Sequence, residues 1–169
     1  MCGIIGYVGE KNATDILFEG LSNLEYRGYD SAGISVFQNG VINTVKSQGR
    51  LRILMDKVTG EAAPLCGNCG IGHTRWATHG EPSDRNSHPH ITQRLSLVHN
   101  GIIENYMQLR AFLLEKGCVF SSETDTEVAA RLIDYYYKGS PHEAIAKAMK
   151  DIEGSFAFGI LFHDFPKTI

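Results

Sequence analysis

Short apolar runs along the chain predict five β-strands. Runs of this length, bounded by glycine or by turn-forming residues, are typical of strands buried in a sheet. They lie at residues 2–8, 34–37, 41–45, 95–98 and 155–162. Gln38-Asn39-Gly40 separates the second and third runs, and an Asn-Gly pair favours the left-handed backbone of a tight hairpin. We therefore expect these two runs to form an antiparallel pair.

A second pattern, with apolar residues three or four positions apart, predicts four helices. Asn12 and Asn105 precede the first two of these stretches and are suited to cap them. Gly117 stands where the second helix would end. Thr124 and Ser140 each precede a glutamate by three residues, which is the spacing of a capping box. The hairpin and the two consecutive helices favour an α+β fold, with helices stacked on antiparallel sheets, over a parallel doubly wound sheet.

The composition fits one soluble globular domain. The 169 residues are 43% hydrophobic and 21% charged, and no repeat, low-complexity tract or Pro/Ser-rich linker divides them. With 16 basic and 19 acidic residues, the net charge of −3 gives no general attraction to nucleic acid or to an anionic membrane. The longest apolar runs, such as residues 156–162, are far shorter than the roughly 20 residues that span a bilayer.

The start of the sequence lacks the basic and then apolar segments of a secretory signal, so we expect a cytoplasmic protein. Its four cysteines, at positions 2, 66, 69 and 118, are then expected to be reduced. Each of them needs an explanation from chemistry or packing rather than from a disulfide.

Cys2 is a candidate nucleophile, because removal of Met1 would leave one residue carrying both a thiol and a free α-amino group. The reference pKa is about 7.7 to 8.0 for the amine and about 8.5 for the thiol. At neutral pH part of the amine is therefore able to accept the thiol proton. Position alone leaves open the simpler interpretation, in which Cys2 is a small apolar residue at the start of a strand.

Residues 73–80, with the sequence His-Thr-Arg-Trp-Ala-Thr-His-Gly, form a second group of candidate functional residues. Arg75 is suited to bidentate capture of a carboxylate, and Trp76 can shield a small substrate from water. Asn100-Gly101 follows a predicted strand and can direct an amide and a backbone N–H at one point, as an oxyanion hole requires. Structural interpretations stay open for both segments: a polar loop whose Trp packs in the core, and a common Asn-Gly turn.

A zinc-binding module is a third interpretation. Five histidines lie within residues 73–99, and Cys66 and Cys69 have the spacing of half a zinc site. A second C-x-x-C motif is absent from the sequence, and the histidines lack the usual helical pair spacing. We therefore expect neither a metal nor another cofactor, and we interpret the two cysteines as flanking a turn before a strand at Ile71.

Taken together, these segments resemble the N-terminal glutaminase domain of the class II glutamine amidotransferases. Within this family the resemblance is to the glutamine–fructose-6-phosphate aminotransferases, or glucosamine-6-phosphate synthases. The matching segments lie at residues 2–6, 25–33, 73–82, 88–90, 99–105 and 122–127. The related amidophosphoribosyltransferases and asparagine synthetases share the terminal Cys and an Asn-Gly pair, but look different around residues 25–33 and 74–82.

The resemblance implies the N-terminal-nucleophile hydrolase fold, with αββα layers in which helices cover the outer faces of two stacked antiparallel sheets. It also implies hydrolysis of L-glutamine to glutamate and ammonia through a glutamyl thioester on Cys2. The α-amino group of Cys2 would act as the base. Asn100 Nδ2 and the Gly101 N–H would hold the oxyanion.

The same resemblance assigns the substrate-binding residues. Arg75 would bind the α-carboxylate of glutamine, helped by Thr78 and His79, and Asp125 would take its α-ammonium group. Trp76 lies where the family gates the release of ammonia. Asp125 also opens a predicted helix, where a carboxylate is electrostatically favoured whatever its role.

In the family, the glutaminase domain continues beyond the segment that matches residues 155–162, and a sugar-phosphate isomerase half follows. We therefore expect residues 1–169 to be an amidotransferase domain that is incomplete at its C-terminal end, with the missing isomerase half as its partner. A missing strand would expose a sheet edge and favour a homo-oligomer. If Met1 is retained, the alternative is a catalytically silent fragment that only binds glutamine or a partner chain.

Overall fold

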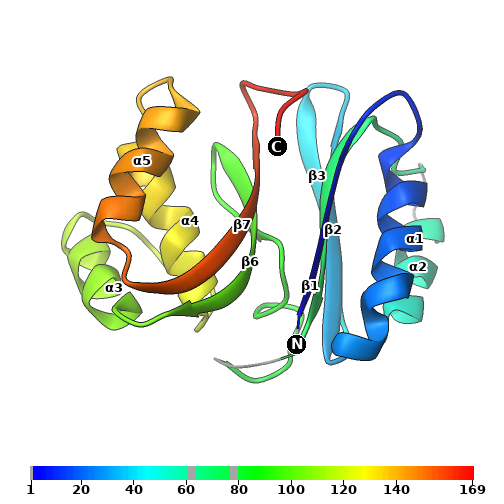
Figure 1. Ribbon diagram of the computed structural model, residues 1–169, viewed down its shortest axis with the longest axis horizontal. Helices are drawn as coiled ribbons and strands as arrows, with labels where there is room; N and C mark the ends of the chain where they lie inside the picture. The colour runs from blue at the N-terminus through cyan, green and yellow to red at the C-terminus, as the bar shows by residue number, and fades with distance from the viewer. Residues whose placement is uncertain (1, 61–63, 77–79) are drawn as a thin grey trace.

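The computed structural model describes residues 2–60, 64–76 and 80–169, which build two antiparallel sheets packed face to face (Figure 1). The first sheet has the strand order β1-β4-β2-β3 and the second has the order β5-β6-β7. The strands of the first sheet are β1 (Gly3–Val8), β2 (Ser31–Gln38), β3 (Val41–Gln48) and β4 (Cys69–Arg75). Those of the second are β5 (His90–Ile91), β6 (Leu95–Ile103) and β7 (Gly154–Phe162).

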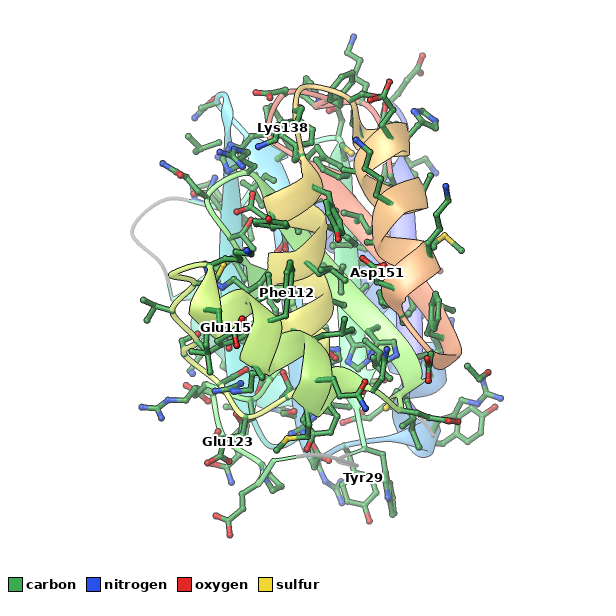
Figure 2. The ribbon with its side chains drawn as sticks, turned by 90° about the vertical axis from the view of Figure 1, so that its left-hand side faces the viewer. Tyr29, Phe112, Glu115, Glu123, Lys138 and Asp151 are labelled. Atoms are coloured by element: carbon green, nitrogen blue, oxygen red, sulfur yellow. The ribbon has the colours of Figure 1, made fainter. Side chains whose placement is uncertain are left out.

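Helices cover the outer face of each sheet. The first sheet is covered by α1 (Ala13–Leu24), which runs into a short 3₁₀ helix η1 (Glu25–Arg27), and by α2 (Leu51–Thr59) (Figure 1). The second is covered by α3 (Tyr106–Glu115), α4 (Asp125–Tyr136) and α5 (Pro141–Asp151), which face the viewer in Figure 2. The expected α+β arrangement with αββα layers is confirmed.

Local signals in the sequence account for several element boundaries. Asn39 and Gly40 have φ values of 54° and 83°, so the predicted hairpin turn joins β2 to β3. The side chains of Asn12, Thr124 and Ser140 accept hydrogen bonds from backbone N–H groups in the first turns of α1, α4 and α5. These caps satisfy N–H donors that a helix leaves unpaired at its start.

Three structural features differ from the sequence-based expectations. Helix α2 was not among the predicted elements, although Leu51, Leu54 and Val58 have helical spacing and are buried. The predicted strand at 95–98 extends to Ile103, so it includes the Asn-Gly pair. Asn105 precedes α3, but its side chain contacts the backbone of Asp151 and Glu153 instead of capping the helix.

Side chains alternate between the two faces of each strand, as the pleat of a sheet requires. In β4, Ile71 points into the space between the two sheets and packs with Val98 and Leu161. The outer faces build separate cores, one against α1 and α2 and one against α3, α4 and α5. The alternation places every second residue of β4 opposite the second sheet, which determines the location of the candidate site.

Two further expectations concern membrane-spanning helices and the edges of the sheets. No helix among the described residues is both long and apolar enough to cross a bilayer. Within the described part of the chain, β7 is an edge strand of the second sheet. The homo-oligomer expected from an exposed edge stays a prediction.

Candidate active site

A cavity of about 530 Å³ opens at one end of the space between the two sheets. Its wall brings together Cys2, Arg75, Asn100, Gly101 and Asp125, which come from three strands or strand ends and from the first position of α4. With Trp76, which also lines the cavity, these are six of the eight site residues predicted from the sequence. The remaining lining residues are Arg27, His88, His99, Ile102, Thr124 and Thr126.

Cys2 lies directly before β1 and is half-buried in the wall of this cavity. Its Sγ accepts a hydrogen bond from the Trp76 N–H at 3.2 Å and lies 3.4 Å from the Trp76 carbonyl oxygen. Its own carbonyl oxygen accepts a hydrogen bond from Asn100 Nδ2 at 3.3 Å. The thiol is therefore beside the cavity and not in packed hydrocarbon.

Asn100 and Gly101 lie inside β6, opposite Ala157 and Phe156 of β7, and not in the turn that the Asn-Gly pair suggested. Gly101 has a φ of 124°, which residues with a side chain rarely adopt. A Cβ at this position would also collide with the carbonyl oxygen of Ser155. Glycine is therefore required here by the close approach of β7, and the cavity is open at its backbone.

His73, on the inner face of β4, contacts the side chain of Asn100. His73 Nε2 lies 3.0 Å from Asn100 Oδ1 and 3.0 Å from the backbone oxygen of His99. Burial lowers the pKa of His73 to about 3, so the ring is neutral at physiological pH. The sequence analysis considered His73 only as part of a polar segment or a metal site, and it missed this contact.

Arg75 and Asp125 place opposite charges on the wall of the same cavity. Arg75 is at the end of β4, and its Nη2 donates to the Gly80 carbonyl oxygen at 3.1 Å. Burial lowers the pKa of Arg75, while the charges of Asp30 and Asp125 act in the opposite direction. Asp125 Oδ2 accepts a hydrogen bond from the Ile103 N–H at 3.1 Å. A cavity that presents the Arg75 guanidinium and the Asp125 carboxylate is suited to a zwitterion.

Trp76 lines the cavity, and its expected role as a shield over the site stays a prediction. The side chain of Trp76 is 51% exposed, and its ring contacts Tyr29 edge-to-face at 5.8 Å. Figure 2 shows Tyr29 at the same end of the molecule as Glu123, which precedes α4. The backbone of Trp76, and not its indole, contacts the thiol. The predicted site residues Thr78 and His79 lie outside the described residues.

A buried carboxylate supports the loop before α4, and sequence reasoning missed it. Glu127 is 1% exposed and accepts hydrogen bonds from the backbone and hydroxyl groups of Ser121 and Ser122. These hydrogen bonds outweigh the opposing effect of burial and lower the pKa of Glu127 to about 2. The capping-box spacing signalled the start of the helix, but not that the glutamate would bind the preceding loop. Glu127 thereby holds the turn that leads into Asp125.

The cysteines of the C-x-x-C motif are at the other end of β4. Cys69 is the buried first residue of that strand and Cys66 is exposed in the preceding turn, as the sequence analysis expected. Within residues 2–60, 64–76 and 80–169, no group of three or more His, Cys, Asp or Glu side chains is arranged to hold a metal ion.

Comparison with protein families gives this arrangement its context. A model described as a glutamine amidotransferase domain matches residues 73–168, more than half of the chain. The chain belongs to this family. The match covers Arg75, Asn100, Gly101 and Asp125 of the cavity wall, whereas Cys2 lies before the matched residues.

Curated relatives extend the likeness of this amidotransferase domain to the whole chain. It is 58% identical to a glutamine–fructose-6-phosphate aminotransferase (isomerizing) of Caldanaerobacter subterraneus and 50% identical to one of Thermus thermophilus. Both matches cover 100% of this chain and 28% of the relative. The chain therefore spans less than a third of the length of these proteins.

Solved structures show the same fold. A glutamine phosphoribosylpyrophosphate amidotransferase from B. subtilis, complexed with ADP and GMP, has a TM-score of 0.82 and 29% identity. It covers 96% of this chain and 35% of its own. A structure described as the allosteric regulatory enzyme of purine biosynthesis has a TM-score of 0.83, 28% identity and the same 96% coverage. The N-terminal-nucleophile fold implied by the sequence is thus supported by both.

Proposed function

We propose that this chain hydrolyses the side-chain amide of L-glutamine to give glutamate and ammonia. The observation that carries the proposal is the single cavity that Cys2, Arg75, Asn100, Gly101 and Asp125 line together. It combines a nucleophile, two candidate oxyanion donors and two opposite charges. Membership of the glutamine amidotransferase family supports glutamine as the amide donor.

The charges of the cavity wall account for recognition of the substrate. The Arg75 guanidinium binds the α-carboxylate of glutamine, and the Asp125 carboxylate binds its α-ammonium group. An Arg–carboxylate pair is directional and charge-assisted, so it fixes the amino-acid end of the ligand and leaves the carboxamide toward Cys2. Thr78 and His79 join this set as predictions from the sequence resemblance alone.

The first chemical step forms a glutamyl thioester. After removal of Met1, the α-amino group of Cys2 takes the thiol proton, and Sγ attacks the carboxamide carbon of glutamine. The electron pair of the C=O bond moves to oxygen, where Asn100 Nδ2 and the Gly101 N–H stabilise the negative charge. The tetrahedral intermediate then reforms C=O and breaks the C–N bond, and the Cys2 α-ammonium gives its proton to the departing ammonia.

The second step returns the enzyme to its starting state. Water loses a proton to the same α-amino group and attacks the thioester carbon. Collapse of this second intermediate breaks the C–S bond, releases glutamate and restores the thiol. No metal or cofactor takes part in either step of the proposal.

The ammonia has a destination in the longer relatives. Their name couples glutamine to fructose 6-phosphate, and this chain corresponds to 28% of their length. We infer that the reaction described here is the ammonia-supplying half of glucosamine-6-phosphate synthesis, and that the partner is a sugar-phosphate isomerase half. In this proposal Trp76, which is half-exposed at the cavity wall, gates the transfer between them. A reduced, cytoplasmic thiol suits this chemistry.

The test combines intact mass with a glutamine-like diazoketone. The electrophile is expected to add once, at Cys2, on chains that lack Met1, and the same preparation is expected to release ammonia from glutamine. Cys66→Ser is the matched control, because it removes an exposed thiol outside the cavity and leaves labelling unchanged. Retained Met1 with an unmodified Cys2 would support the silent fragment instead, and labelling at Cys66 would show mere thiol reactivity.

A further inference from the structure

The contacts of His73 determine which of its ring nitrogens carries the proton. Nε2 lies 3.0 Å from Asn100 Oδ1 and 3.0 Å from the backbone oxygen of His99. A backbone carbonyl oxygen is only an acceptor, so an unprotonated Nε2 at this distance would set lone pair against lone pair. Because the ring is neutral, it has one proton, and that proton is on Nε2.

The same geometry determines the orientation of the Asn100 amide. The oxygen and nitrogen of an asparagine amide are distinguished by their partners rather than by shape. At one end of the amide His73 Nε2–H is a donor, which requires Oδ1 there. At the other end the Cys2 carbonyl oxygen is an acceptor 3.3 Å away, which requires Nδ2. A flipped amide would lose both hydrogen bonds and oppose like partners at each end.

We propose that His73 is a positioning residue that holds the Asn100 amide with Nδ2 toward Cys2, so that the donor faces the reacting carbon. The inference rests on the proposed function, because the oxyanion is formed at that point. His73 is 1% exposed and acts through Asn100 without touching the substrate. Without it the amide keeps only the hydrogen bond to the Cys2 carbonyl oxygen, so the turned amide, which presents Oδ1 and repels an oxyanion, becomes more populated.

Burial makes the histidine a reliable donor. His88 stacks on His73 with ring centroids 4.1 Å apart, and His88 is itself buried with its pKa well below the ordinary value. His99, on strand β6 of the facing sheet, and Arg75 add further unfavourable interactions to a charged His73 ring. Protonation of His73 is thus opposed by its surroundings, and the proton on Nε2 stays in place as the pH varies near neutrality.

The first test observes the proton directly and needs no turnover. In the unmodified 169-residue chain labelled with ¹⁵N-histidine, nitrogen NMR is expected to show His73 with a protonated Nε2 and an unprotonated Nδ1 from pH 8 to pH 5. The His73→Gln spectrum assigns the signals. A proton on Nδ1, or a charged ring near pH 6.5, would overturn the inference even if glutamine is hydrolysed.

The second test uses two replacements of His73. His73→Met fills the space without a donor, whereas His73→Gln places an N–H donor near the position of Nε2. We expect His73→Met to lower kcat for glutamine hydrolysis about 10- to 100-fold with KM within about threefold, because only the oxyanion contact is weakened. His73→Gln is expected to recover about tenfold or more of that loss.

Ser35→Ala is the matched control for damage to the sheet interface. Ser35 is fully buried on β2 and its Oγ contacts Ser96 Oγ of β6 at 2.7 Å, so it also bridges the first sheet to the strand of Asn100. This variant is expected to keep both kcat and KM.

Equal losses in Ser35→Ala and His73→Met would reduce His73 to a structural role. A His73→Met enzyme with unchanged kcat, or with a change in KM alone, would also refute positioning. If the unmodified chain releases no ammonia, the proposed function fails, and the nitrogen spectra still decide whether His73 orients the amide.

Discussion

The surfaces of β4 and β6 that face each other are apolar at one end and polar at the other. At the apolar end Ile71 packs against Val98 with the sheets in close contact. Two residues further along each strand, His73 meets Asn100 through a hydrogen bond. The two ends share strands and sheet pairing, and they differ in side-chain chemistry and in the cavity that opens beside Asn100. Packing at the apolar end therefore holds the two sheets together, whereas hydrogen bonding at the polar end orients the groups of the candidate site.

The apolar end gains free energy from burial alone and tolerates no open space. The polar end has buried groups that are stable only when each donor meets an acceptor. The polar end therefore depends on the orientation of its groups. The Nε2 proton of His73 must face Asn100 Oδ1, and Asn100 Nδ2 must face the Cys2 carbonyl oxygen. We expect substitutions at the apolar end to change the free energy of unfolding, and substitutions at the polar end to change kcat or the pH dependence.

The largest expected effect is at the polar end, in Cys2→Ala. Loss of the nucleophile is expected to reduce ammonia release by more than about 10³-fold. Cys2 is only half-buried, so the free energy of unfolding should change by less than about 1 kcal/mol. Ammonia assays and urea unfolding on the same sample check both parts. Substantial turnover without the thiol would remove Cys2 from the chemistry.

The second effect is at the apolar end, in Ile71→Ala. Ile71 is fully buried between the sheets, so its truncation should lower the free energy of unfolding by about 2–5 kcal/mol. KM for glutamine should stay within about threefold in the folded fraction. Ile91→Ala is the control, since Ile91 is 53% exposed and should cost less than about 0.5 kcal/mol. If Ile71→Ala instead raises KM and leaves the free energy of unfolding unchanged, then the apolar end does not contribute to stability independently of the site.

The third effect is a pH dependence that belongs to the polar end. Burial lowers the pKa of His73 to about 3 and that of His90 well below 6.5. Below pH 6.5 the unfolded chain therefore binds protons that the folded chain does not, and stability is lost as the pH falls. The slope from each such ring grows as the pH falls through 6.5 and approaches about 1.4 kcal/mol per pH unit near pH 5. Urea unfolding between pH 7 and pH 5 measures it.

Two variants test whether buried neutral histidines cause this pH dependence of the free energy of unfolding. His90→Gln should reduce the slope by up to about 1.4 kcal/mol per pH unit at the low end of the range, whereas Ile71→Ala should shift the whole curve downward and leave the slope unchanged. Glu127, with a pKa of about 2 in the folded chain, is ionised in both states over most of this pH range, so its contribution begins only near pH 5, where the unfolded glutamate starts to bind protons. A slope that His90→Gln leaves intact would contradict the assignment to buried neutral histidines.

Much of the fold was predictable because its signals are local. The turn at Asn39-Gly40 and the caps at Asn12, Thr124 and Ser140 each act within four residues, and the structure confirms them. Helix α2 was missed although its spacing was present. The strand predicted at 95–98 was too short, because pairing with β7 extends it through Asn100-Gly101 despite the local preference of this pair for a turn.

The candidate site was predictable only in part. The family resemblance named Cys2, Arg75 and Asp125, and the structure brings these residues to one cavity. The contact of His73 with Asn100 joins residues 27 positions apart on different sheets. No periodicity encodes such a contact, since it depends on how the two sheets are placed against each other.

The smallest effect is expected for Ser35→Ala, a variant that tests where the apolar end stops and the polar end begins. Ser35 is a polar residue within reach of the apolar end, and its hydroxyl contacts both Ser96 and Thr44, the latter at 2.6 Å. Its removal should lower the free energy of unfolding by about 1 kcal/mol, less than Ile71→Ala. Ser35→Cys, which is close to serine in size but a much weaker hydrogen-bonding group, serves as the comparison in urea unfolding. If either variant lowered kcat, the polar end would extend beyond His73, and the two ends could no longer be treated as independent.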